Sequence, residues 1–172
     1  GGSSISSVGI APTTDGRFGA ISVFDTIGDR LAAASEMGAS EALLPSESHT
    51  AGPFDVAIEV SGNARALQSA IDSTSPGGRI IVGSWYGNDD VRLKLGIDFH
   101  RSRKTIKASQ VSEIPPELRG LWTKERRFAL TWELMKLIRP SRLITKTVTL
   151  DQAQEAYELL DRGDEISVSF RY

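Results

Sequence analysis

The hydrophobic pattern between residues 20 and 83 alternates between short β-prone runs and segments whose apolar positions repeat with helical spacing. Four apolar runs bounded by turn residues predict strands at 20–24, 41–44, 54–60 and 79–82. Thr26 is predicted to cap a first helix, and a second begins at Ala64. Strands that alternate with helices predict a parallel sheet with helices on its faces, because parallel strands need crossover connections.

The pattern changes beyond residue 83. Thr123 is predicted to cap a longer helix that ends before Pro140, and its apolar rows predict burial in a core or an interface. A T-x-x-Q capping box from Thr149 to Gln152 predicts a last helix. An alternating strand at 166–170 follows it.

The first 19 residues are dominated by Gly, Ser, Thr and Pro, and Ile5, Val8 and Ile10 predict at most one short strand there. We therefore expect two regions. Residues 1–19 form an irregular or remodelled segment, and residues 20–172 form one α/β domain that ends in a helix and a strand.

Composition narrows the chemistry. The chain has 172 residues, a net charge of −2 and no cysteine, which excludes disulfides, thiolate zinc sites and iron–sulfur clusters. With only two histidines we assign no metal ligands. The charge balance indicates neither a nucleic-acid nor a membrane partner, and the missing cysteines fit a cytoplasmic protein.

Several motifs occur in an order that resembles a known family. These are Arg17–Asp25, Asp55–Gly62, Pro76–Gly83, Leu150–Tyr157 and 166–170, with Phe99–Arg101 and Ser109–Ser112. Together they resemble the coenzyme-binding half of the zinc-containing medium-chain alcohol dehydrogenase/reductase family over residues 17–172. The resemblance implies a Rossmann-like parallel sheet flanked by helices. Family members are about twice as long and carry zinc and substrate ligands in an N-terminal catalytic domain.

The sequence departs from the family at its start. A dinucleotide site of this class uses G-x-G-x-x-G between the first strand and the first helix. The glycines present, in Gly9–Pro12 and Gly16–Gly19, do not match that spacing. We therefore expect a Rossmann-like sheet that lacks a normal first βα unit.

The resemblance implies that NAD is the cofactor and places its contacts at strand ends. Asp25 would bind the adenosine ribose hydroxyls and favour NAD over NADP, although by position alone it is equally a carboxylate flanking a helix. The resemblance also places Arg30 among the cofactor contacts. Val60, Ser61 and Gly62 would line the adenine side, and Gly83, Ser84 and Trp85 would lie near the nicotinamide.

Three functions remain open. The first is an NAD(P)-dependent oxidoreductase for alcohols and carbonyls, represented by its coenzyme domain and inactive unless another polypeptide supplies the catalytic part. The second is a non-catalytic module that dimerises or binds a partner. The weakest is a hydrolase, because the Gly83–Gly87 segment is not a G-x-S-x-G elbow. By resemblance we expect a homodimer through sheet-edge strands 79–82 and 105–111. The sequence identifies no catalytic residue and no substrate.

Overall fold

The computed structural model describes residues 7–11, 19–48, 51–88 and 90–172. The chain divides into two compact units. The first contains Gly1–Ser109 and Asp161–Asp164, and the second contains Gln110–Leu160 and Glu165–Tyr172. The domain boundary expected after residue 19 stays a prediction.

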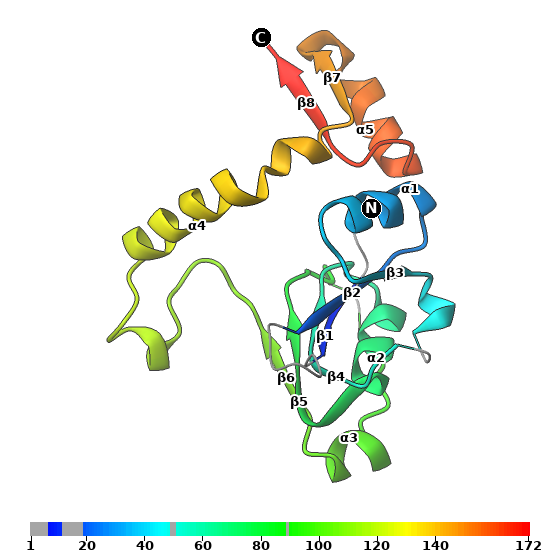
Figure 1. Cartoon of the computed structure of the whole chain (residues 1–172), viewed down its shortest axis with the longest axis vertical. Coiled ribbons are helices and arrows are strands. Elements are labelled where there is room, and N and C mark those ends of the chain that lie inside the picture. The colour runs from blue at the N-terminus through cyan, green and yellow to red at the C-terminus, as the bar shows by residue number, and fades with distance from the viewer. Residues whose placement is uncertain (1–6, 12–18, 49–50, 89) are drawn as a thin grey trace. The chain divides into compact units, whose positions relative to one another are not determined.

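The first unit is built on a six-stranded sheet with the order β3-β2-β1-β4-β5-β6 (Figure 1). Its strands are β1 (Ser7–Ala11), β2 (Ala20–Phe24), β3 (Glu41–Leu43), β4 (Phe54–Glu59), β5 (Thr74–Val82) and β6 (Thr105–Ala108). The pairs β2–β3, β4–β5 and β5–β6 are parallel. This strand order is the Rossmann order, so the predicted α/β fold is confirmed.

The first strand runs against its neighbours. In β1, Ser7 pairs with both Phe24 and Glu59, and Ala11 pairs with Ala20, so the strand is antiparallel to β2 and to β4. The short strand predicted around Val8 is confirmed, but the sheet is not parallel throughout. Residues 12–19 alone connect β1 to β2, and a parallel crossover needs a dozen residues or more. The missing βα unit therefore leaves a reversed strand in the central position of the sheet.

Two helices lie between the parallel strands: α1 (Gly28–Glu36) joins β2 to β3, and α2 (Ala64–Asp72) joins β4 to β5. The apolar side of α2 covers the middle of the sheet. This core contains Leu67, Ala70 and Ile71 of α2 with Ala57 and Ile80 of the strands. The three large side chains in it, Leu67, Ile71 and Ile80, each contribute about 1.5–3 kcal/mol to stability. The core therefore fixes the ends of β4 and β5 relative to each other.

Two local predictions are wrong. Thr26 does not cap α1: the N-cap is Ile27, whose N–H donates to Oδ1 of Asp25 at 2.9 Å. The strand expected from residue 79 begins earlier, at Thr74, and shifts register against β4 between Phe54 and Val56. Gly78 permits this, because a Cβ there would lie 2.5 Å from Cγ2 of Thr74.

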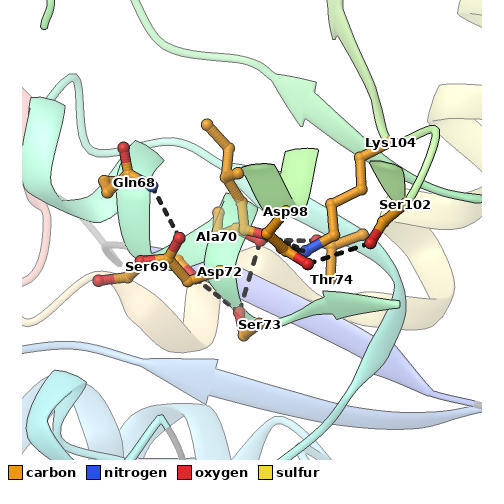
Figure 2. Close-up of polar contacts among 10 residues, drawn as sticks. Gln68, Ser69, Ala70, Asp72, Ser73, Thr74, Asp98, Ser102 and Lys104 are labelled. Carbon is orange, nitrogen blue, oxygen red and sulfur yellow. Dashed lines mark hydrogen bonds and ion pairs between the residues drawn. The ribbon is translucent and has the colours of Figure 1, made fainter. Parts of the chain in front are cut away.

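A cluster of polar contacts lies at the C-terminal end of α2 (Figure 2). Thr74 Oγ1 donates to the Ala70 carbonyl at 2.6 Å. Nζ of Lys104, which precedes β6, donates to the Ile71 carbonyl at 2.8 Å and contacts Asp98 at 2.5 Å. The Lys104 side chain is 2% exposed. A buried ammonium needs such partners, so this cluster attaches the helix end to the amino edge of the sheet.

The second unit contains α4 (Lys124–Ile138) and a parallel pair, β7 (Lys146–Thr149) and β8 (Val168–Arg171), connected through α5 (Ala153–Arg162). The predicted caps are confirmed. Oγ1 of Thr123 accepts from the Arg126 N–H at 3.2 Å, and Thr149 forms its capping box with Gln152.

The remaining short elements are α3 (Ile97–Arg101) and 3₁₀ turns at Pro45–Glu47, Pro116–Leu118, Pro140–Leu143 and Leu150–Gln152.

The apolar rows of α4 differ from expectation. Burial in a core is wrong, because the helix has no buried residue, and Trp132 and Leu137 are 61% and 80% exposed. The interface alternative stays a prediction. Among the described helices, none combines the length and the apolar character needed to cross a bilayer.

Candidate functional site

The candidate site lies at the carboxyl ends of β2, β4 and β5, which meet at one edge of the sheet because these strands run in the same direction. In open α/β sheets this edge is where ligands bind. Asp25 follows β2, Val60 follows β4 and Gly83 follows β5. The fold thus places residues from three predicted groups on the same edge.

The loops after β4 and β5 contact each other directly. The Gly83 N–H donates to the Glu59 carbonyl at 2.8 Å. Gly62 has φ +70°, and a Cβ on it would lie 3.0 Å from the Trp85 carbonyl oxygen. A side chain at Gly62 would be strained in conformation and crowded by backbone. The structure therefore brings the loop Val60–Gly62 into contact with the loop Gly83–Trp85.

Glu59, the last residue of β4, connects these loops and was missed by sequence reasoning. Its side chain is fully buried. Oε1 accepts from the Ser61 N–H at 2.6 Å, from Ser61 Oγ at 2.5 Å and from the Gly62 N–H at 3.1 Å. Oε2 accepts from the hydroxyls of Ser84 and Tyr86. The available signal was a carboxylate inside an otherwise apolar strand.

These hydrogen bonds decide the charge of Glu59. Burial raises its pKa, but the bonds from Ser61, Ser84 and Tyr86 outweigh burial and lower the pKa below its ordinary value. Burial and the bond to Glu59 raise the pKa of Tyr86. Near neutral pH Glu59 is therefore an ionised acceptor and Tyr86 a protonated donor. The Ser84 proton points at Glu59, so this serine is a structural donor here.

Asp25 and Arg30 form a second buried group at the same edge. Both are nearly inaccessible, with exposures of 1% and 5%, and Oδ2 of Asp25 lies 4.0 Å from Nη1 of Arg30. That distance exceeds a hydrogen bond. Within the part of the chain that the structure describes, Oδ2 of Asp25 and Nε and Nη1 of Arg30 are buried without hydrogen-bond partners. Such groups are rare and mark a candidate for ligand contact.

The remaining predicted residues line the open side of the loops. Trp85 is 85% exposed, Gly83 is exposed, and Val60, Ser61 and Gly62 are half-buried. An indole this exposed is available to contact a ligand or a partner. No contact between these loops and the Asp25–Arg30 pair is seen among the described residues, so the edge has two separate polar groups.

Comparison with known proteins agrees with this arrangement. The zinc-binding dehydrogenase family matches residues 16–125. Among solved structures, an alcohol dehydrogenase from Thermotoga maritima is 24% identical with a TM-score of 0.69, covering 87% of this chain and 42% of that one. No curated protein sequence matches the chain.

Two further solved structures carry a nicotinamide cofactor. An alcohol dehydrogenase from Escherichia coli complexed with NADH is 20% identical, with a TM-score of 0.66 and coverage of 88% of this chain and 44% of that one. A protein from Sinorhizobium meliloti bound to NADP is 19% identical, with a TM-score of 0.61 and the same coverage.

At these identities the solved structures show the fold alone, and the chain spans about two fifths of their length. The family match covers well over half of the chain. Its position and the Rossmann strand order agree with the motifs of the sequence. The chain therefore belongs to the zinc-binding dehydrogenase family, of which it contains the C-terminal, coenzyme-binding half.

Proposed function

We propose that this chain is the coenzyme-binding part of an NAD(P)-dependent oxidoreductase that interconverts alcohols and carbonyls, with NAD as the preferred cofactor. The family and the two cofactor-bound structures support this. The observation that carries it is Asp25, a carboxylate at the end of β2 with a buried oxygen that has no hydrogen-bond partner among the described residues.

The Asp25–Arg30 pair fits the adenosine ribose. A vicinal diol can both donate and accept hydrogen bonds. In the pair, Oδ2 of Asp25 lacks a donor, and Nε and Nη1 of Arg30 lack acceptors. A ribose would meet that capacity once the cover over these buried atoms opens, because Asp25 and Arg30 are only 1% and 5% exposed. A 2′-phosphate would bring negative charge to the Asp25 carboxylate, which is why NAD is preferred over NADP.

The residues present do not fit the pyrophosphate. In a Rossmann site the loop that follows β1 cradles it at the carboxyl edge. Here Ala11, at the end of β1, pairs with Ala20, the first residue of β2, so the β1–β2 connection starts and finishes at the amino edge. Gly16 lies outside the described residues, and Gly19 lies next to β2. Cofactor binding by this chain is therefore expected to be weak.

NAD, when bound, would supply the hydride acceptor for the oxidation of an alcohol to a carbonyl. The role of this chain is to bind and orient. Val60–Gly62 and Gly83–Trp85 offer backbone and indole surface beside the ring. We propose that a separate catalytic part supplies acid–base groups and substrate contacts.

Zinc does not fit the described residues. No three histidine or acidic side chains lie together there in an arrangement that would hold a metal ion, and the sequence has no cysteine. We derive no step through zinc.

We propose that the partner is a second copy of the chain, bound through the edge strand β6. This strand is last in the sheet order, and it pairs with β5 on one side. An edge strand offers backbone N–H and C=O groups that pair with another strand. Residues 79–82, expected at the edge with it, lie in β5, which pairs with both β4 and β6.

One observation favours the second function, a non-catalytic module. The reversed β1 removes the pyrophosphate cradle while the order of the other strands is kept. A chain of this kind folds and pairs without a need for cofactor. The two functions differ in one measurable property, the affinity for NADH.

The test is a titration of the full chain with NADH and NADPH, followed by tryptophan fluorescence. A W122F/W132F variant leaves Trp85, at the end of β5, as the single reporter. NADH binding with a dissociation constant of about 1 mM or tighter, near 4 kcal/mol, supports the proposal. Lack of a response to either cofactor at 10 mM favours the module.

A further inference from the structure

We propose that Glu59 is the positioning residue of the coenzyme edge, because its two carboxylate oxygens each hold one of the two loops that face the cofactor. This inference rests on the proposed function and deepens it. It concerns a residue that would not contact the cofactor and that acts through Ser61, Gly62, Ser84 and Tyr86.

The division of labour between the two oxygens is the central observation. Among the described residues, Oε1 accepts from the turn that follows β4, at Ser61 and Gly62. Oε2 accepts from the loop that follows β5, at Ser84 and Tyr86, which lie 25 and 27 residues after Glu59 in the sequence. One side chain therefore connects the two loops.

The environment of Glu59 makes this connection strong. The side chain is fully buried, and its partners among the described residues are hydroxyls and backbone N–H groups. A buried carboxylate is stable only when its acceptor sites are filled, so each donor is held in place. Its lowered pKa keeps the carboxylate ionised, which strengthens the bonds to both loops.

The loop after β5 carries an exposed indole between two side chains that are bound to Glu59. Trp85 lies between the two donors, Ser84 and Tyr86, yet its side chain is 85% exposed. The Tyr86 ring packs against the α2 core while its hydroxyl reaches Glu59. The Glu59 oxygen Oε2 and this ring therefore fix the stretch that the proposed function places beside the nicotinamide.

Two variants remove the bonds between Glu59 and the loop after β5 in different ways. S84A/Y86F removes both donors to Oε2 and keeps the Oε1 donors of the turn after β4, at Ser61 and Gly62. E59D keeps a carboxylate on a side chain that is one methylene shorter. This side chain can still accept from the N–H two residues later, as Asp25 accepts from the Ile27 N–H. It does not reach the loop that follows β5. K104M is the matched control, since it removes the donor to the Ile71 carbonyl at the C-terminal end of α2, at the edge of the sheet opposite both loops.

All variants are made in the W122F/W132F background, and two properties are measured well below the unfolding temperature. The first is the fluorescence anisotropy of Trp85, which reports the mobility of the loop without any cofactor. The second is the affinity for NADH. We expect S84A/Y86F and E59D each to lower the anisotropy and to weaken NADH binding about tenfold, because the loop must then be ordered on binding. K104M should change neither.

The outcomes are distinguishable. Unchanged anisotropy in both variants overturns the connection itself. Lowered anisotropy with unchanged NADH affinity overturns the positioning role, and so does an equal loss of affinity in K104M. If the unmodified chain does not bind NADH, the proposed function fails and the cofactor role of Glu59 fails with it. Lowered anisotropy would in that case still identify Glu59 as the residue that holds the loop.

Discussion

The carboxylate of Glu59, at the end of β4, accepts a hydrogen bond from the hydroxyl of Tyr86, 27 residues later in the chain. Neither residue carries a motif, and the fold alone brings them together. The pair joins the core under α2 to the edge where the proposed cofactor binds, and it sets the first prediction.

Replacing Glu59 by Gln should reduce the acid sensitivity of the first unit. The lowered pKa means that Glu59 stabilises the fold above its ordinary pKa of 4.5, and that this contribution is lost as the pH falls through the folded value. Urea unfolding of E59Q and of the unmodified chain, followed by Trp85, should show a smaller loss in E59Q between pH 6 and pH 3.5. Equal losses would contradict a depressed pKa in the folded state.

Replacing Asp25 by Asn should weaken NADH binding by about tenfold or more, since a hydrogen bond to a charged group contributes about 1.5–3 kcal/mol. Asn keeps an oxygen for the Ile27 N–H, so α1 is preserved. Loss of the negative charge should also reduce the preference for NADH over NADPH. Titration with both cofactors checks this, and an unchanged ratio of affinities would argue against a ribose role.

Replacing Lys104 by Met should destabilise the first unit by about 1–3 kcal/mol, because it leaves the Ile71 carbonyl at the end of α2 without its donor. Asp98 is exposed and regains water, so D98N should have a smaller effect. K94M, at an exposed position, serves as the control. The measurement is chemical unfolding, and a K104M loss no larger than that of K94M would show that the contact is not stabilising.

A charge introduced into β6 should separate the proposed dimer. Ala108, the last residue of β6, is exposed, and A108D would place a charge within the pairing of two edge strands. Light scattering should report a dimer for the unmodified chain and a monomer for A108D. A32D, at an exposed site on α1, should remain a dimer. An A108D protein that stays dimeric would exclude this edge as the interface.

The parts of the fold that sequence reasoning predicted are those with a local physical cause. The helical spacing in 64–72 and the capping box at Thr149 depend on neighbours within a few residues, and both are present in the structure. The direction of β1 depends instead on the length of its connection to β2. The register shift between β5 and β4 depends on the fit of Gly78 against β4.

The candidate site divides in the same way. Asp25, Ser61 and Gly83 lie at strand ends, and a strand end is visible in the hydrophobic pattern. Glu59 was not found, because its function depends on hydroxyls of a different strand-to-loop junction. A carboxylate in a buried strand is the warning signal, but its partners become identifiable only once β4 and β5 are paired.

The reversal of β1 also places its first residue at the edge of the candidate site. Ser7 pairs with Phe24 and with Glu59 at the carboxyl edge of the sheet. In a sheet with a parallel β1 this edge would instead hold the last residue of the strand. A spectroscopic label at Ser7 would therefore lie close to the candidate site and would report on a bound cofactor.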